Sequence, residues 1–437
     1  MPVREDLGTI GVQQVMSSTI DLPALAASAP EIDLRFDELK RRKLVLDMTR
    51  GKPCPEQLDL ANGLLTILGA ADYIASDGTD CRNYGGLDGL PEAKKLFADF
   101  MEVAPNEIVI GDNSSLPLLH DSVARALSHG VPGGGGPWSR GPVKFLCPVP
   151  GYDRHFTICQ HFGIEMVNVP MTDEGPDMDV VEMLAGADAA VKGIWIVPRY
   201  SNPTGVTCSE RVVERLARMT TAAPDFRIFW DNAYAHHHLT DTPPKLANLL
   251  AACKASGQPE RVLLFGSTSK VSLASAGLGV FAGSEINVAW LRMHRSKQTI
   301  GPDKLTQLRH VRWFRDMDGI AAHMKKHAAI LKPKFDAVDQ IFTRELGGKG
   351  LAEWTRPLGG YFVGLDVVPG TARAVVKMAG EVGVKLTEAG ATYPYGKDPD
   401  DRNLRIAPSL PTLPEIETAM AVVALCVQRA ALDKLAR

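Results

Sequence analysis

The sequence lacks the features that mark membrane, secreted and nucleic-acid-binding proteins. Its 48 Lys and Arg are balanced by 51 Asp and Glu, and a net charge of −3 gives no basic field for nucleic acid or an anionic membrane. No apolar run has the length of a transmembrane helix or a signal peptide. The seven cysteines are scattered, without a CxxC pair, which favours reduced thiols over a disulfide framework or a zinc site. Composition therefore predicts a cytoplasmic enzyme with no metal, membrane or nucleic-acid partner.

What is present is a chain with the size and composition of a globular enzyme. Of its 437 residues, 45% are hydrophobic and 23% are charged, and this length can bury two or more large cores. We expect an N-terminal arm and the start of a small domain over residues 1–55. A large domain is expected over 56–310, and a small C-terminal domain over 311–437.

Apolar segments of strand length alternate with helical segments through the first two thirds of the chain. Small or polar residues follow these segments, which lie at 107–110, 144–147, 165–169, 190–197, 226–230 and 262–265. Such alternation predicts an α/β fold with a mainly parallel sheet and a ligand site beyond the carboxyl ends of the strands. From about residue 285 the pattern is mostly helical, with short strands predicted at 358–364 and 403–407, which indicates a smaller α+β domain.

Lys270 stands just after the predicted strand at 262–265, where no charged residue accompanies it. The residues that follow, Val271–Ala276, are apolar or small. Such surroundings disfavour the ammonium form of a lysine, and the neutral amine is the nucleophile that Schiff-base chemistry needs. A lysine that reaches from a strand end to water would have the same local sequence, so this stretch alone leaves both interpretations open.

Three further segments are candidate binding loops. Gly111–Ser115 separates a predicted strand from an apolar helix, where free N–H groups and the helix dipole favour an anion. Simple N-capping by Ser114 or Ser115 uses the same geometry. Gly51 permits either a close backbone approach or a turn. Tyr84, in a glycine-rich loop, is either a surface ring or a ligand contact.

Four motifs follow one another in a fixed order along the chain. They are Asn202-Pro-Thr-Gly205, Asp231-Asn-Ala-Tyr234, Ser267-Thr-Ser-Lys270 and Arg405, with 29 residues from Asn202 to Asp231 and 39 from there to Lys270. From about Leu44 onward the chain resembles the class I/II aminotransferases of fold type I, which use pyridoxal 5′-phosphate. The stretches 148–156, 231–239 and 301–310 are similar to the divergent aspartate aminotransferase subgroup Ic. The resemblance implies a large domain with a mainly parallel seven-stranded sheet flanked by helices, plus a smaller α+β domain.

The resemblance also implies roles around the cofactor ring. Lys270 would form the Schiff base and carry the proton between the substrate and the cofactor. Asp231 would face the pyridine nitrogen and favour the protonated ring. Tyr234 and Asn202 would hydrogen-bond the phenolic oxygen of the ring, and Tyr152 would stack on its face. Lys270, Asp231 and Tyr234 are the predicted catalytic residues.

The cofactor phosphate would lie on hydroxyl groups of two loops. The resemblance assigns Ser114, Ser115 and Ser267 to it. Tyr84 and Thr299 resemble residues that reach the phosphate from a partner subunit, which implies a homodimer with shared active sites. Relatives usually carry an arginine shortly after the lysine, but residues 277–281 contain no cation. Either another base compensates, or the phosphate relies on N–H groups and hydroxyls.

Substrate carboxylates require cations. The resemblance places Arg405 on the α-carboxylate, because a planar guanidinium matches a carboxylate with two parallel hydrogen bonds, and Asn202 would assist. Gly51 is placed among the substrate contacts. Arg295 aligns with the residue that a partner chain donates to a distal carboxylate, although an exposed helix arginine is an equally good interpretation.

The resemblance implies an aminotransferase that moves an amino group between L-aspartate, or a similar dicarboxylic amino acid, and 2-oxoglutarate by a ping-pong mechanism. Two alternatives stay open. An aminotransferase of other specificity or a lyase of the same fold could use the same lysine, aspartate and tyrosine. An aminotransferase-like ligand sensor would need a DNA-binding module, for which residues 1–45 are short and contain Pro23 and Pro30.

Overall fold

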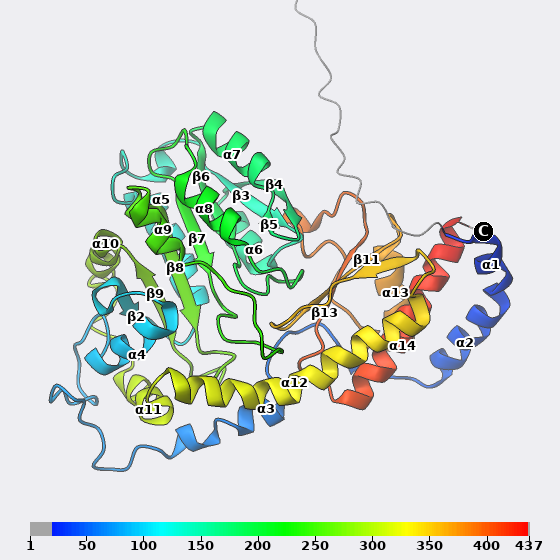
Figure 1. Ribbon diagram of the computed structural model, residues 1–437, viewed down its shortest axis with the longest axis horizontal. Coiled ribbons are helices and arrows are strands. Elements are labelled where there is room, and N and C mark those ends of the chain that lie inside the picture. Colours follow the sequence, from blue (N-terminus) through cyan, green and yellow to red (C-terminus); the bar gives the residue numbers. More distant parts are fainter. Residues whose placement is uncertain (1–19, 436–437) are drawn as a thin grey trace, which may run out of the picture.

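Eight strands of the described residues assemble into a large central sheet (Figure 1). The computed structural model describes residues 20–435. In the sheet, the strand order is β2-β9-β8-β7-β6-β3-β4-β5. The bounds are β2 (Ile108–Ile110), β3 (Lys144–Val149), β4 (Glu165–Thr172), β5 (Gly175–Pro176), β6 (Val191–Ile196), β7 (Arg227–Asp231), β8 (Val262–Ser267) and β9 (Gly279–Gly283).

The sheet is mainly parallel, as the sequence predicts. The five strands β4, β3, β6, β7 and β8 run parallel to one another, whereas β9 is antiparallel to both of its neighbours. Seven strands were predicted for this sheet. The eighth strand, β5, has only two residues and forms a hairpin with β4. Strand β9 begins within the glycine-rich stretch at 277–281 and ends at Gly283, where no strand was predicted.

Helices cover both faces of this sheet. Alternate residues of a strand point to opposite faces, so Ile228 and Phe229 belong to different apolar clusters. The cluster around Ile228 includes residues of α4 (Pro91–Met101), α7 (Met178–Ala187), α8 (Glu210–Arg218), α9 (Leu249–Ala255) and α11 (Lys304–Phe314). The cluster around Phe229 includes residues of α5 (Ser115–His129), α6 (Asp153–His161) and α10 (Glu285–Arg295).

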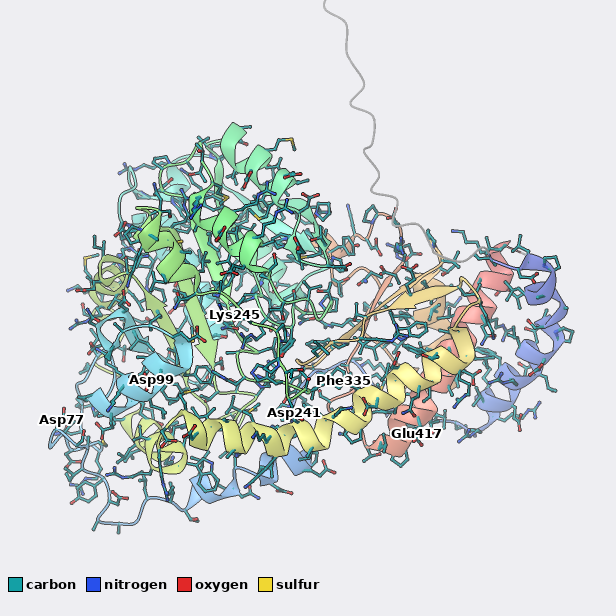
Figure 2. The ribbon with its side chains drawn as sticks, in the orientation of Figure 1. Asp77, Asp99, Asp241, Lys245, Phe335 and Glu417 are labelled. Atoms are coloured by element: carbon teal, nitrogen blue, oxygen red, sulfur yellow. The ribbon has the colours of Figure 1, made fainter. Side chains whose placement is uncertain are left out.

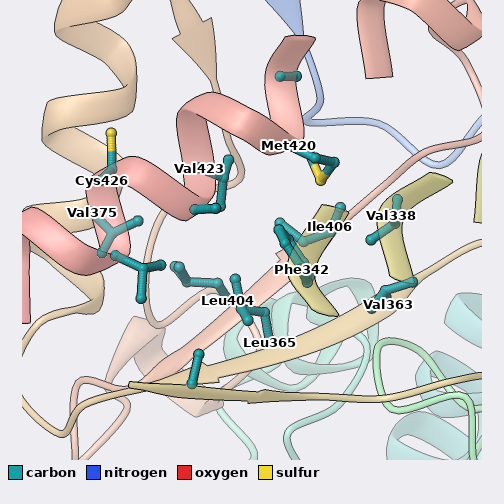
Figure 3. Packing of buried hydrophobic residues seen from close by; sticks show 14 of the residues in the cluster. Val338, Phe342, Val363, Leu365, Val375, Leu404, Ile406, Met420, Val423 and Cys426 are labelled. Atoms are coloured by element: carbon teal, nitrogen blue, oxygen red, sulfur yellow. The ribbon is translucent and has the colours of Figure 1, made fainter. Parts of the chain in front are cut away.

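A second lobe is built from both ends of the described chain (Figure 1). Its antiparallel sheet has the order β10-β11-β13, formed by β10 (Ala352–Trp354), β11 (Val363–Val367) and β13 (Asn403–Ile406). Beside it lie α1 (Leu22–Ala27), α2 (Ala29–Arg41), α13 (Ala372–Val382) and α14 (Leu413–Leu435). Strand β1 (Leu46–Asp47) pairs in parallel with β12 (Val384–Lys385), which ties the N-terminal segment to this lobe. Figure 3 shows part of its core, where Phe342, Leu365, Leu404 and Met420 converge.

The long helix α12 (Met317–Leu346) connects the two lobes (Figure 1). Ile320, near its start, packs in the core of the large sheet, whereas Phe342, near its end, packs in the core of the second lobe. On this helix, Phe335 lies close to Asp241 in the view of Figure 2, where the two lobes meet. The remaining helices are α3 (Pro55–Asp59) and the short 3-10 turns Asn62–Leu65, Pro105–Glu107, Trp138–Arg140, Pro259–Arg261 and Pro394–Gly396. Between residues 20 and 435, no helix combines the length and apolarity needed to cross a bilayer.

Candidate functional site

A cavity of about 260 Å³ opens at the carboxyl ends of β6, β7 and β8. Eight of the predicted site residues line it, namely Ser114, Ser115, Tyr152, Asn202, Asp231, Tyr234, Ser267 and Lys270. They are spread over more than 150 positions of the sequence and meet because parallel strands bring their carboxyl ends to one edge. A larger cavity of about 1100 Å³ lies between α12 and residues 236–243, but none of the predicted residues lines it.

Lys270 stands in a turn that follows β8. Its amine lies 5.2 Å from the ring centroid of Tyr234 and 5.8 Å from that of Tyr361. Enclosure of the amine lowers the pKa of Lys270, and the negative charge of Asp231 acts in the opposite direction. Lys270 lines the cavity, so its amine can meet a ligand there and is easier to deprotonate than that of a surface lysine.

Asp231 ends strand β7 and is only 2% exposed. Its Oδ2 accepts a hydrogen bond from Nε2 of His155 at 3.0 Å, and the Ser115 hydroxyl lies 3.5 Å from Oδ1. The ring of His155 stacks on Trp195 at 4.4 Å. This arrangement keeps a carboxylate in place inside the cavity. The sequence analysis did not identify His155, although it lies in the stretch 148–156 that carries the family resemblance.

Two tyrosines form walls of the cavity. Burial is the main cause that raises the pKa of both Tyr152 and Tyr234, and the carboxylate of Asp231 adds to the shift. Both phenols are therefore neutral at physiological pH and can donate hydrogen bonds. Asn202, in the segment between β6 and α8, is 2% exposed and lies on the same cavity.

Hydroxyl groups and a helix N-terminus gather at the other end of the cavity. Ser114 is the N-cap residue of α5, but its side chain makes no capping hydrogen bond, so its hydroxyl is free to contact an anion. The hydroxyls of Ser267 and Ser269 are 2.7 Å apart. Gly279, in the stretch without a cation, allows a close backbone approach, because a Cβ atom there would come within 2.2 Å of the Ser114 carbonyl oxygen. Strand β9 packs too closely against the Ser114 loop for any side chain at this position.

Arg405 projects from β13 of the second lobe and is 8% exposed. Its Nη1 donates to Oδ1 of Asp153 at 2.7 Å and lies 3.5 Å from Oδ1 of Asn202. The guanidinium also lies 5.1 Å from the ring centroid of Phe362. Gly51 leaves room for the Phe362 ring, since a Cβ atom at residue 51 would lie 2.2 Å from Phe362 Cζ. Gly51 itself does not line the cavity.

Tyr84 and Thr299 lie outside this cavity. The Tyr84 side chain is 83% exposed, and Lys304 Nζ holds its loop by donating to the carbonyl oxygens of Asn83 and Gly85 at 2.6 and 2.8 Å. Thr299 bonds with the backbone of Gly301, which packs on Gly85. The two predicted residues thus belong to adjoining segments, away from the cavity of their own chain. Asp77 lies at the outer edge of the molecule in Figure 2.

Arg295 is not brought to the cavity either. It lies near the end of α10 with 2% exposure, and its Nη1 donates to the Ile110 carbonyl oxygen at 3.0 Å. Asp112 Oδ1 lies 3.9 Å from its Nη2. The alternative interpretation, an exposed helix arginine, is wrong, because the guanidinium is enclosed in its own chain. Donation to a partner would require the side chain to leave these contacts.

Four buried histidines form a group that the sequence analysis missed, and we call His237, His310, His323 and His327 the histidine cradle. Nε2 of His237 donates to the Lys270 carbonyl oxygen at 3.2 Å, and Nε2 of His323 donates to that of Val271 at 2.7 Å. Nε2 of His327 lies 3.1 Å from Nε2 of His323. The histidines therefore hold the backbone of the turn that carries the lysine.

Hydroxyl groups and a side-chain amide form hydrogen bonds with the histidine cradle. The Ser272 hydroxyl bonds to Nε2 of His310 at 2.8 Å, while Nδ1 of this ring donates to the Thr306 carbonyl oxygen. Gln57 Nε2 lies 2.9 Å from both His327 Nδ1 and the Tyr361 hydroxyl. Burial lowers the pKa of all four histidines, to about 4 for His310 and His327, so they are neutral at pH 7. Buried neutral histidines carry no motif, so only the packing identifies them.

Comparison with known proteins agrees with this geometry. Residues 20–437 match the family described as aspartate amino-transferase. An aspartate aminotransferase of Corynebacterium glutamicum is 48% identical over 427 residues, which cover 97% of this chain and 99% of that protein. A crystal structure of an aspartate transaminase from C. glutamicum superposes with a TM-score of 0.93 and 48% identity, covering 95% of this chain and 99% of that one. An α-aminoadipate aminotransferase of Thermus thermophilus, complexed with phosphopyridoxyl-leucine, shares the fold with a TM-score of 0.72 at 19% identity over 90% and 95% of the two chains.

The sheet, the lysine after β8 and the facing carboxylate define a pyridoxal phosphate-dependent aminotransferase of fold type I. Within that class, the chain belongs to the aspartate aminotransferase family. Its donor set fits pyridoxal 5′-phosphate: the cavity offers an amine, a buried carboxylate opposite, and hydroxyls with a helix N-terminus at one end.

Proposed function

We propose that this aminotransferase exchanges the amino group of L-aspartate with 2-oxoglutarate in a ping-pong cycle, with Lys270 as the Schiff-base lysine. The observation that carries the proposal is the placement of the Lys270 amine and the Asp231 carboxylate on one cavity that also holds two tyrosines. The preference for aspartate is supported by the C. glutamicum relative, which is named an aspartate aminotransferase.

The cofactor supplies an aldehyde that condenses with amines and a protonated pyridine ring that accepts the electron pair of the Cα–H bond. Lys270 would then take the proton from the substrate Cα and transfer it to the cofactor. Its lowered pKa makes the neutral amine available for this step. The rings of Tyr234 and Tyr361 limit where the amine can move.

Asp231 would face the pyridine nitrogen and keep its proton in place. The hydrogen bond from His155 fixes the carboxylate, and stacking on Trp195 fixes the histidine. Tyr234 and Asn202 would donate hydrogen bonds to the phenolic oxygen, since both line the cavity and Tyr234 is a neutral phenol. Tyr152 would cover one face of the ring.

The phosphate would be held by Ser114, Ser115 and Ser267 together with the N–H groups at the start of α5. We infer that Tyr84 and Thr299 reach the phosphate of a second copy, which makes the protein a homodimer with shared active sites. The exposure of Tyr84 supports this inference, and so does the fact that Tyr84 does not line the cavity of its own chain. So does Lys304, which fixes the loop without covering the ring.

For the substrate, Arg405 would bind the α-carboxylate with help from Asn202, and Gly51 would keep Phe362 against the guanidinium. Arg295 remains a prediction for the distal carboxylate, and its burial in its own chain does not favour that role. We also propose domain boundaries near residues 55 and 310. The second lies ahead of Phe314, Ile320 and Met324, which still pack in the core of the large sheet, whereas Leu331 packs in that of the second lobe. A cytoplasmic location is proposed because all seven cysteines are free.

The visible absorption spectrum of the protein, loaded with pyridoxal phosphate, tests the proposal. Addition of L-aspartate without a keto acid is expected to bleach the yellow band as the pyridoxamine form accumulates, and 2-oxoglutarate is expected to restore it. A band that aspartate leaves unchanged would refute the substrate. Oxaloacetate should appear in a single turnover, whereas release of ammonia or carbon dioxide would indicate a lyase instead.

A further inference from the structure

The substrate arginine is paired with a carboxylate of the protein itself. Nη1 of Arg405 donates to Oδ1 of Asp153 at 2.7 Å, which is the length of a strong charge-assisted hydrogen bond. Arg405 belongs to β13 of the second lobe, and Asp153 is the first residue of α6 in the large lobe. The pair therefore bridges the two lobes at the site.

Asp153 contacts the Arg405 guanidinium next to the wall of the cavity, although Arg405 itself is not among the residues that line it. The same Nη1 lies 3.5 Å from Oδ1 of Asn202, a residue of the cavity wall, and Asp153 directly follows Tyr152, another wall residue. Nε of Arg405 is buried and has no hydrogen-bond partner among the described residues. A carboxylate that binds an arginine in the usual way needs two parallel N–H donors. Nη1, the donor near Asn202, is already bonded to Asp153.

We propose that Asp153 is an internal competitor, which occupies Arg405 while the site is empty and is displaced when a substrate carboxylate binds. The proposal rests on the function assigned above to Arg405. Two carboxylates on one guanidinium nitrogen repel each other, and Arg405 is too enclosed for water to screen them well. Binding of an amino acid then replaces the ion pair between Arg405 and Asp153 with one between Arg405 and the substrate. The net free energy of binding is therefore smaller than the contribution of the new ion pair alone.

Asp153 can leave the arginine at low cost. Its side chain is 31% exposed, whereas that of Arg405 is 8% exposed. As the first residue of α6 it also lies beside free backbone N–H groups, where the helix dipole favours a negative charge. Only a ligand that brings its own carboxylate can replace the lost partner of Arg405. Asp153 therefore acts as a specificity-determining residue that excludes amines without a carboxylate and speeds product release.

The test compares Asp153→Asn and Asp153→Ala with the parent holoenzyme, using succinate as the probe, because it has the dicarboxylate skeleton of aspartate without the amino group. We expect the dissociation constant of succinate to fall roughly tenfold in both variants, which corresponds to the loss of a modest competing ion pair. The KM for aspartate should fall in parallel. As a control, Asp179→Asn removes an exposed carboxylate that pairs with Arg215 and should change neither value.

A succinate affinity that stays the same or weakens in both Asp153 variants would overturn the proposal, since Asp153 would then orient Arg405 rather than compete at it. Retention of the cofactor absorption band verifies that the variants fold. Arg405→Lys distinguishes a failure of the role assigned to Arg405 from a failure of the competitor role of Asp153. If it does not weaken succinate binding, the assigned role of Arg405 fails. If it does weaken binding while the Asp153 variants show no gain, only the competitor role fails.

Discussion

The two ends of the cavity differ in how many parts of the chain hold them in place. The turn that carries Lys270 is bonded by side chains from the loop after β7, from α11 and from α12, and Gln57 of α3 braces the network. The opposite end consists of hydroxyls from two neighbouring loops. Among the described residues that line the cavity, Lys270 is the only cation.

This difference matches what each end must do. A group that moves a proton needs a fixed distance to the reacting carbon, because a small displacement of such a group slows the reaction strongly. A phosphate can be held by several weak donors, and a second subunit can supply more of them. We therefore expect changes at the lysine end to reduce turnover, and changes at the phosphate end to reduce cofactor affinity.

Replacement of the lysine tests the first half of this comparison with the largest effect. Lys270→Ala removes both the attachment point of the cofactor and the base, so kcat should fall by at least about 10³-fold. Steady-state transamination of aspartate measures it. Lys332→Ala, which removes an exposed lysine paired with Asp336, is the control and should retain activity. Activity within tenfold of the parent would contradict the role of Lys270.

The histidine cradle should matter for turnover and not for substrate binding. His327→Leu removes the bond to Gln57 and the polar contact with His323, which itself bonds to the Val271 carbonyl, and this loosens the lysine turn. We expect kcat to fall roughly tenfold with KM for aspartate nearly unchanged, the size expected for one or two lost buried hydrogen bonds. His327→Gln keeps a donor and should recover part of the rate. An equal loss in both variants, or a rise in KM alone, would argue against positioning.

At the phosphate end, Ser267→Ala should leave kcat close to the parent value at saturating cofactor. Loss of one neutral hydroxyl contact should raise the dissociation constant of pyridoxal phosphate about three- to tenfold. Equilibrium dialysis of the cofactor measures this change. Ser256→Ala, a hydroxyl that bonds only to backbone carbonyls away from the cavity, provides the matched control. A large loss of kcat with unchanged cofactor affinity would reverse the comparison of the two ends.

The cradle also makes a prediction about pH. Burial lowers the pKa of His327 to about 4 from its ordinary value of 6.5, so the unfolded chain binds a proton there at a higher pH than the folded chain does. The free energy of unfolding should therefore fall as the pH decreases from about 6.5 toward 4. Urea unfolding at several pH values measures the slope. His327→Gln should make the slope shallower, and an unchanged slope would mean that His327 is not buried in its neutral form.

The sequence predicted most of the fold because its signals are local. Alternating apolar segments and helices indicate a parallel sheet, and polar residues at the ends of strands indicate where the site lies. Lys270 was identifiable because it lies shortly after a buried strand without a charged neighbour, whereas the role of Asp231 came from the family resemblance. Strand β9 was missed because its glycines weaken the strand pattern, although they are needed where the backbone packs on Ser114.

The remaining parts of the site depend on contacts between distant segments. His327 lies on α12, whose sequence gives no sign that the face with His327 packs near the turn of Lys270. In the sequence, a buried neutral histidine cannot be distinguished from an exposed one. The pairing of Asp153 with Arg405 joins positions 252 residues apart. Arg295 shows the opposite error: its basic neighbours indicated an exposed helix face, yet tertiary packing buries it.

Arg295 offers the test with the smallest expected kinetic effect. Because its guanidinium bonds to the Ile110 carbonyl inside its own chain, Arg295→Gln should leave KM for aspartate within about twofold of the parent value. The same change removes a buried charge-assisted hydrogen bond and should lower the free energy of unfolding by about 1.5–3 kcal/mol. Thermal unfolding together with aspartate kinetics measures both quantities. A tenfold rise in KM with unchanged stability would instead place Arg295 on the distal carboxylate, and the burial seen here would then belong to a state that rearranges when two subunits meet.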